Sequence, residues 1–332
     1  YFRIFGAEIA ESQLLQIKKF SSATYDFVDS IIQHNVLIFH DGENGLTILP
    51  KLIDVIPEAR YNLSILYLRQ NEPVEAYNVI KDIDPLDPAD AILKAIISYA
   101  AGESTDNEVL IQEANTTFAE IGQMEVIKDT IPGRQCFAMS KFIEGDYESA
   151  LRILHTIEEF IGTTDEFKYN IGMTLAALSR YKEAESYFVG IENEDYKQEL
   201  FYTSWLAKCF IKNNKCDKAW ELYIQATQTD DANTLLQIIS NEAYLSGQYY
   251  YAMKAYHALT QFDLNPDYKQ GMIASSAGLF RSILSQKEDS SYVIEILTIL
   301  NSDPDDQQMM SALQIIQNYV DTSDTFNLMD GI

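Results

Sequence analysis

The chain has 332 residues, of which 47% are hydrophobic and 22% are charged, so it can bury a sizeable core and is not disordered as a whole. Its 50 acidic residues outweigh its 24 basic ones, which gives a formal net charge of −26. Such a charge repels phosphate backbones and anionic lipid surfaces, so we predict no nucleic-acid partner; it suits basic protein partners instead.

The cysteine content and the hydropathy of the chain indicate its redox compartment and whether it enters a membrane. Cys136, Cys209 and Cys216 are an odd number without a Cys-x-x-Cys pair, which indicates a reducing compartment and no disulfide framework. No apolar run approaches the ~18 residues of a membrane span, so we predict no membrane insertion. No signal peptide is visible, and because the chain starts at Tyr1 rather than Met, we expect further residues upstream of it.

The N-terminal half predicts helices in pairs. Residues 6–20 and 23–39 form two helices of a segment, 1–40, that continues a truncated upstream solenoid. Pro57 closes a unit that contains Gly45, and Pro88 closes the unit 60–88, because proline stops a helix. Residues 89–131 make an irregular unit with helices at 89–101 and 108–121 and a lengthened turn at 102–106.

Four alanines then recur at nearly constant spacing. Ala150, Ala184, Ala219 and Ala252 are 34, 35 and 33 residues apart, a period typical of the tetratricopeptide repeat. With each alanine at position 20, position 8 is small and position 24 is bulky, as close helix packing requires. The small residues are Ala138, Gly172, Ala207 and Ser240, and the bulky ones are Leu154, Phe188, Tyr223 and Tyr256.

The turns inside these repeats and the C-terminal region complete the pattern. Gly145, Asn214 and Gly247 fall where the first helix should end in a left-handed residue, whereas Ser179 fits less well. After residue 266 helices are expected at 267–285, 292–300 and 306–320, with a faint repeat signature. The predicted fold is an all-α tetratricopeptide-repeat solenoid, a superhelix of stacked helical hairpins, with repeats over 41–266 and a degenerate cap over 267–332.

The cap ends in an acidic stretch. From Glu288 to Ile332 there are nine Asp or Glu residues and no Lys or Arg. The simpler interpretation is a solvated end of the solenoid, and the alternative is a docking patch for a basic segment.

The sequence contains no complete catalytic or metal-binding motif. Residues 155–159 (HTIEE) resemble a zinc-protease helix, but Glu159 stands where the second histidine is needed. There is no phosphate-binding loop, no Gly-x-Gly-x-x-Gly after a strand and no Gly-x-Ser-x-Gly elbow. We therefore predict no enzyme, no cofactor and no metal site.

The repeat register selects a candidate partner-binding surface. Positions 2, 5, 9, 12 and 13 of the first helices usually face the inner groove of such solenoids. Half of these residues could instead be buried between repeats, and the rest form an aromatic and aliphatic stripe with a few cations, which suits an amphipathic helix or an extended segment. The candidates are Tyr61, Ile65, Arg69, Met139, Phe142, Tyr169, Met173, Lys208, Lys212, Asn241 and Tyr244.

Position 5 bears on one alternative function. Co-chaperone repeats capture a C-terminal carboxylate with cations there, whereas this chain has Tyr61, Gln135, Tyr169, Ser204 and Gln237. A carboxylate clamp is therefore not expected. A cytosolic co-chaperone or another protein-binding scaffold stays open as the alternative function.

Seven strings carry more than the generic repeat. They are 52–60 (LIDVIPEAR), 67–70 (YLRQ), 75–82 (EAYNVIKD), 129–136 (DTIPGRQC), 204–209 (SWLAKC), 219–223 (AWELY) and 265–268 (NPDY). In this order they resemble the C-terminal part of the intraflagellar transport protein 56 family, over residues 25–285. The resemblance implies a non-catalytic subunit of intraflagellar transport complex B in the cilium or flagellum, its base and the cytoplasm. It also implies attachment through intraflagellar transport protein 46 and a link to import of motility proteins.

Overall fold

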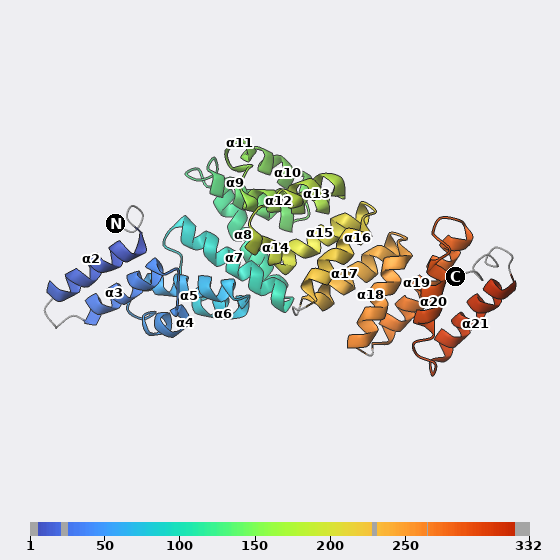
Figure 1. Cartoon of the computed structure of the whole chain (residues 1–332). Helices are drawn as coiled ribbons and strands as arrows, with labels where there is room; N and C mark the ends of the chain where they lie inside the picture. The colour runs from blue at the N-terminus through green and yellow to red at the C-terminus, as the bar shows by residue number, and fades with distance from the viewer. Residues whose placement is uncertain (1–5, 21–25, 228–230, 264, 323–332) are drawn as a thin grey trace. The chain divides into compact units, whose positions relative to one another are not determined.

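The computed structural model describes residues 6–20, 26–227, 231–263 and 265–322, and within these ranges every regular element is helical (Figure 1). The chain forms two compact units, unit 1 over Tyr1–Ile157 and unit 2 over Glu158–Ile332. In each unit consecutive helices pack as antiparallel hairpins, so the predicted all-α hairpin fold is confirmed for the described residues. The three-part division at residues 40 and 266 stays a prediction.

Unit 1 is built from long helices and two short ones near residue 50. Its helices are α2 (Ala7–Phe20), α3 (Asp26–Phe39), α4 (Gly45–Ile48), the short 3-10 helix η1 (Leu49–Lys51), α5 (Pro57–Arg69), α6 (Pro73–Ile80), α7 (Pro88–Thr105), α8 (Glu108–Gln123), α9 (Ile131–Ile143) and α10 (Tyr147–His155).

Unit 2 continues the pattern with two further short helices, α11 and α14, that the periodicity did not predict. Its helices are α11 (Glu158–Ile161), α12 (Asp165–Ala177), α13 (Tyr181–Val189), α14 (Glu194–Gln198), α15 (Leu200–Lys212), α16 (Cys216–Ala226), α17 (Ala232–Leu245), α18 (Tyr249–Phe262), α19 (Pro266–Leu284), α20 (Tyr292–Leu300) and α21 (Gln307–Thr322).

The predicted register describes the packing inside the hairpins. The four recurring alanines are at most 1% exposed, and Ala76, at the same position upstream, is fully buried. Small residues at position 8 are buried as well, including Ser64 of α5. At Gly172 an added Cβ would lie 3.0 Å from the ring of Phe188, so the glycine lets α12 and α13 approach closely. The period therefore reports real helix-to-helix contacts.

A left-handed residue follows the first helix of six of the described hairpins, including the irregular unit. The residues with positive φ at these turns are Asn71, Asp106, Gly145, Ser179, Asn214 and Gly247. At Ser179 φ is 61°, and the next amide, Arg180 N–H, donates to Leu175 O at 2.9 Å, which is the bond of a Schellman motif. Ser179 thus takes the same conformation as the glycines, although serine is the poorer residue for it.

Two expectations about helix ends were wrong. The first helix of the irregular unit runs on to Thr105, through the predicted turn, and ends at left-handed Asp106. Gly102 is buried inside it, and an added Cβ would meet Ile111 of α8 at 2.8 Å, so this glycine serves packing rather than a turn. Pro57 and Pro88 begin α5 and α7 rather than closing the preceding unit, because proline lacks the N–H that the first turn leaves unpaired.

The remaining helices agree closely with expectation. The predicted helix at 292–300 is α20, and the helices expected at 267–285 and 306–320 are α19 and α21 with ends shifted by one or two residues. The acidic stretch beyond Thr322 and the predicted helix start at 23–25 lie outside the described residues. Among the described helices, none combines the length and hydropathy of a membrane span.

Candidate partner-binding site

The clearest groove formed by predicted residues lies in unit 2, across the first helices of two consecutive hairpins. It has a volume of about 400 Å³ and is open to solvent along α15 and α17. We call it the α15–α17 groove; its lining residues are Ser204, Trp205, Lys208, Thr234, Gln237, Ile238, Asn241 and Glu242.

The buried faces of α15 and α17 fix the positions of the groove side chains. Leu206, Ala207 and Phe210 of α15 and Leu235, Leu236 and Ile239 of α17 are almost fully buried. Residues at 204, 205 and 208, and at 237, 238 and 241, follow helical spacing on another face, so burial of the first set turns the second set toward the groove.

Glu242 joins two lysines across the groove. Lys212 Nζ lies 2.6 Å from Glu242 Oε2, and Lys208 Nζ lies 3.4 Å from Oε1. Burial acts to raise the pKa of Glu242, but the hydrogen bond from Lys212 and the charge of Lys208 outweigh it and hold the pKa below its ordinary value of 4.5. One carboxylate therefore faces two ammonium groups, so the cluster of Lys208, Lys212 and Glu242 beside the groove carries one net positive charge.

Two amide side chains of α17 form hydrogen bonds with tyrosines of α18 and α19. Tyr256 of α18 donates its hydroxyl hydrogen to Asn241 Oδ1 at 2.7 Å, and Gln237 Nε2 donates to the hydroxyl of Tyr268 at 2.8 Å. Gly271 of α19 makes room for the ring of Tyr256, since an added Cβ would lie 2.6 Å from it. The orientation of both amides is thus set by neighbouring helices.

Trp205 supplies the apolar wall of the groove on α15. It is partly exposed, and Lys208 Nζ lies 5.6 Å from the centre of its ring, within cation–π range. Trp205 is only partly buried because position 6 of α15 faces the groove. Trp220 does pack between repeats, with its ring 6.3 Å from that of Tyr251 and Lys254 Nζ 5.0 Å from its centre.

The structure brings some predicted residues of unit 2 together and leaves others apart. Lys208 and Asn241 line the groove, and Lys212 reaches it through Glu242. Tyr244 lies one turn beyond, 38% exposed, with its ring 5.7 Å from that of Tyr249. Tyr169 instead packs edge-on against Phe188, and its ring is tilted by 53° to that of Tyr196.

Met173 follows Tyr169 by one turn of α12 and is partly buried. Neither side chain lines the α15–α17 groove. Both stay predictions as binding residues.

In unit 1 the predicted residues have separate surroundings. Ile65 and Arg69 of α5 line a smaller hollow of about 180 Å³, where Arg69 Nη1 lies 3.4 Å from Asp41 Oδ1. Tyr61 packs instead against the cluster of Ala76, Ile80 and Ile97. Tyr61 does not line the hollow that Ile65 and Arg69 share.

On α9, Met139 packs against the core cluster around Phe118. The ring of Phe142 lies 5.1 Å from that of Tyr147 in the same hairpin. Both side chains therefore contribute to packing in unit 1.

The candidates chosen from the repeat register did not include four of the residues that line the groove, namely Trp205, Thr234, Ile238 and Glu242. A signal for Glu242 exists, because it stands 34 residues after Lys208, one repeat along, on the equivalent helix. Opposite charges one repeat apart on first helices therefore predict ion pairs between neighbouring hairpins.

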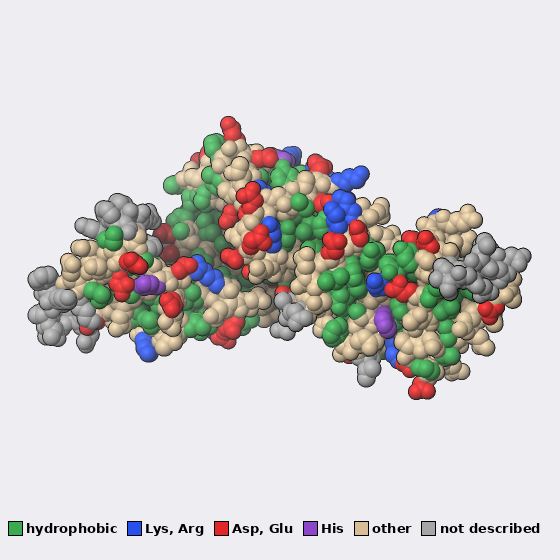
Figure 2. All heavy atoms as spheres, in the orientation of Figure 1, with side chains coloured by type: hydrophobic (Ala, Val, Ile, Leu, Met, Phe, Trp, Pro, Cys, Tyr) green, Lys and Arg blue, Asp and Glu red, His purple; other side chains and the backbone are tan. Residues whose placement is uncertain are grey.

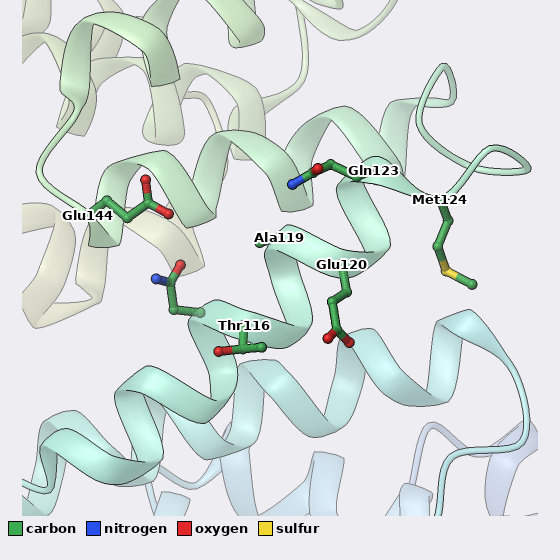
Figure 3. Close-up of a pocket in the computed structure, with 7 residues that line it drawn as sticks. Thr116, Ala119, Glu120, Gln123, Met124 and Glu144 are labelled. Carbon is green, nitrogen blue, oxygen red and sulfur yellow. The ribbon is translucent and has the colours of Figure 1, made fainter.

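A second hollow, of about 560 Å³, opens over α8 in unit 1 (Figure 3). Thr116, Glu120, Gln123 and Met124 come from α8 and its end, and Glu144 lies across from them at the end of α9. Lys141 Nζ, 2.6 Å from Glu144, contributes the largest effect that lowers the pKa of this carboxyl. Its lining offers carboxylates and amides but no cation, thiol or imidazole.

The thiols of Cys136, Cys209 and Cys216 are all buried. Burial raises the pKa of the Cys136 thiol to about 11 and of the Cys209 and Cys216 thiols to about 12, so none forms a reactive thiolate near neutral pH. Within the described ranges, no three His, Cys, Asp or Glu side chains are grouped to hold a metal ion. The lysines and arginines described on the face in Figure 2 are scattered among carboxylates and form no continuous basic surface.

Comparison with known proteins adds an independent finding. The sequence model of the family described as "Intraflagellar transport protein 56" matches residues 1–327. The "Intraflagellar transport protein 56 homolog" of Caenorhabditis elegans is 28% identical over 301 residues, which are 90% of this chain and 52% of that protein. The chain thus spans about half the length of the curated relative it matches.

Solved structures show more distant likeness. "Human IFIT1 dimer with PPP-AAAA" has a TM-score of 0.48 and 13% identity, covering 94% of this chain and 78% of that one. "Structure of Naa15/Naa10 bound to HypK-THB" has a TM-score of 0.32 and 12% identity, covering 94% and 46%. Both scores are too low to carry an argument.

Proposed function

The chain belongs to the intraflagellar transport protein 56 family, and on that premise we propose that it is a non-catalytic subunit of intraflagellar transport complex B. The observation that carries the proposal is the family match over residues 1–327, nearly the whole chain. Stacked helical hairpins agree with such a role, because they present long surfaces to partners and seldom an active site.

In this role the chain acts as a structural adaptor of ciliary trains. Its partners are other complex B subunits, notably intraflagellar transport protein 46, and cargo proteins needed for ciliary motility. It works in the cilium or flagellum, at its base and in the cytoplasm. The net charge of −26 supports protein partners over nucleic acid.

Partner contact is proposed to use the first-helix residues, with the α15–α17 groove as the best-formed part. The groove does not favour the co-chaperone alternative, because Ser204 and Gln237, its residues at position 5, carry no charge. A carboxylate clamp needs cations at position 5, whereas the two lysines of this site, Lys208 and Lys212, stand at positions 9 and 13.

Affinity purification of the full-length protein from ciliated cells, followed by mass spectrometry, tests the proposal. We expect complex B subunits in amounts comparable to the bait. Recovery of chaperones without train subunits would favour the alternative. A strain that expresses the tag alone is the control.

A further inference from the structure

We propose that the α15–α17 groove binds an extended peptide segment of a partner protein in which an acidic residue stands next to an apolar or aromatic one. The inference rests on the proposed adaptor function and names the class of segment that this site accepts. It is carried by the two anchored amides, the surplus positive charge and the apolar side chains that lie together in the groove.

The anchored amides are suited to a peptide main chain. Asn241 Oδ1 is occupied by Tyr256, so its Nδ2 is left to donate, and no described group accepts from it. Gln237 Nε2 is occupied by Tyr268, so its Oε1 is left to accept. The two residues are four apart on α17 and lie on one face. A donor and an acceptor in fixed orientation match the C=O and N–H groups of an extended chain.

The size of the groove favours an extended segment over a helix. Its volume is about 400 Å³. A single turn of an α-helix, about 5.4 Å long and about 10–12 Å across with its side chains, would fill a volume of this size by itself. An extended segment instead places several residues along the groove and exposes the main-chain groups that the amides can bind.

The charge of the groove favours an acidic residue. Lys212 holds Glu242 at 2.6 Å, whereas Lys208 lies at 3.4 Å and its side chain is 34% exposed, so the ammonium of Lys208 is available to a second carboxylate. A basic residue would meet two lysines and one carboxylate that is already paired. The net charge of −26 opposes binding of an acidic segment only weakly, since salt screens charges beyond about 8 Å at physiological ionic strength.

The apolar side chains favour a hydrophobic neighbour for that acidic residue. Successive side chains of an extended segment point to opposite sides. A carboxylate directed at Lys208 on α15 therefore directs the next side chain at Ile238 on α17, which is partly exposed in the groove. Trp205, beside Lys208, offers a second apolar contact on α15.

Selection of short random peptides displayed on phage, with the immobilised full-length protein as bait, tests the inference. Enriched sequences are expected to carry Asp or Glu beside Leu, Ile, Phe, Tyr or Trp. One enriched sequence is then synthesised with a fluorescent label, together with its counterpart in which the acid is replaced by the amide, and affinities are measured by anisotropy. The amide counterpart should bind about tenfold more weakly, the loss typical of a hydrogen bond to a charged group.

Variants of the protein assign the effect to the groove. Lys208→Met should weaken binding of the acidic peptide about tenfold and should change binding of its amide counterpart little. Asn241→Asp keeps the acceptor for Tyr256 but loses the donor, so it should weaken both peptides. Lys218→Met is the matched control: Lys218 Nζ also lies 5.6 Å from a ring centre, that of Phe210, but on α16 outside the groove.

Three results would overturn the inference: enrichment without acidic residues, unchanged binding to Lys208→Met, or equal losses in Lys218→Met. Near-normal far-UV circular dichroism of each variant shows that it has folded. The measurement needs no other train subunit. If affinity purification recovers complex B subunits but the peptide measurements give one of these three results, the proposed class of peptide is refuted and the proposed function is not.

Discussion

Tyr256 donates a hydrogen bond to Asn241 at 2.7 Å and so ties an almost fully buried ring of α18 to a groove residue of α17. The ring keeps its place because Gly271 of α19 has no side chain. Packing between three consecutive helices therefore determines the direction of one amide at the proposed binding surface.

Gly271→Ala tests this coupling. Its Cβ would lie 2.6 Å from the ring of Tyr256, which must move, so we expect a loss of about 1–3 kcal/mol in the free energy of unfolding. Chemical denaturation measures it. Gly145→Ala is the comparison: no atom lies within 4 Å of its added Cβ, so any cost there reflects its φ of 79° alone. Equal losses in the free energy of unfolding for the two variants would show that the ring of Tyr256 moves aside at little cost.

The close approach of α12 and α13 gives a second prediction. Gly172→Leu must push aside the ring of Phe188, 3.0 Å from the new Cβ, and Ala184→Leu must enlarge a fully buried site. Each should lower the melting temperature, with a cost of about 1–3 kcal/mol. Lys182→Leu, at an exposed position of α13, should change it little. Unchanged stability in both core variants would contradict the repeat register.

The left-handed turn at Ser179 predicts a stabilising change. Its φ of 61° costs a serine more than a glycine, so Ser179→Gly should raise the free energy of unfolding by about 0.5–1 kcal/mol. Gly247→Ala, at the equivalent turn with a φ of 73°, should lower it by a similar amount. Urea denaturation of both variants decides the matter. Destabilisation by Ser179→Gly would mean that the serine side chain has a role of its own.

The pairing of Glu242 predicts a pH dependence. Its pKa is lowered in the folded protein, so its contribution is fully present above the ordinary value of 4.5 and is lost as pH falls through the folded pKa. Near neutral pH, Glu242→Gln should be less stable than the unmodified protein by about 1–2 kcal/mol. This difference should shrink steadily below pH 4.5. A difference that stays constant into the acid range would contradict the ion pair.

Because the three cysteine thiols are buried, we expect them to react slowly with thiol reagents in the native protein. Burial raises the pKa of all three cysteines to about 11 or 12 and shields them from reagents. A thiol-specific chromogenic reagent should therefore react with them only as fast as the protein opens, and at once in denaturant. Rapid reaction of one thiol in the native protein would place it in a mobile segment.

The sequence could predict the hairpins because their packing requires residues of fixed size at fixed positions. Ala184 and Gly172 are such residues, and one period suffices to find them. The helix through Gly102 could not be predicted, because a glycine that packs against Ile111 has the same letter as one that ends a helix. Only the neighbouring helix distinguishes the two cases.

The candidate site was predictable in part. The register placed Lys208, Lys212 and Asn241 on the groove-facing side, since helical geometry alone decides this. That Glu242 pairs with both lysines depends on how two repeats dock and on side-chain conformations, which periodicity does not encode. The partial exposure of Trp205 likewise depends on how the two repeats dock.

We propose that the α15–α17 groove of unit 2 faces a partner within the ciliary train. Site-specific photo-crosslinking in ciliated cells tests it most directly, with a benzophenone amino acid at Thr234, in the groove, or at Ile224, 54% exposed on α16. We predict that the probe at Thr234 links the protein to a complex B subunit or its cargo, and that the probe at Ile224 does not. Equal products from both positions, or none from Thr234, would contradict the account.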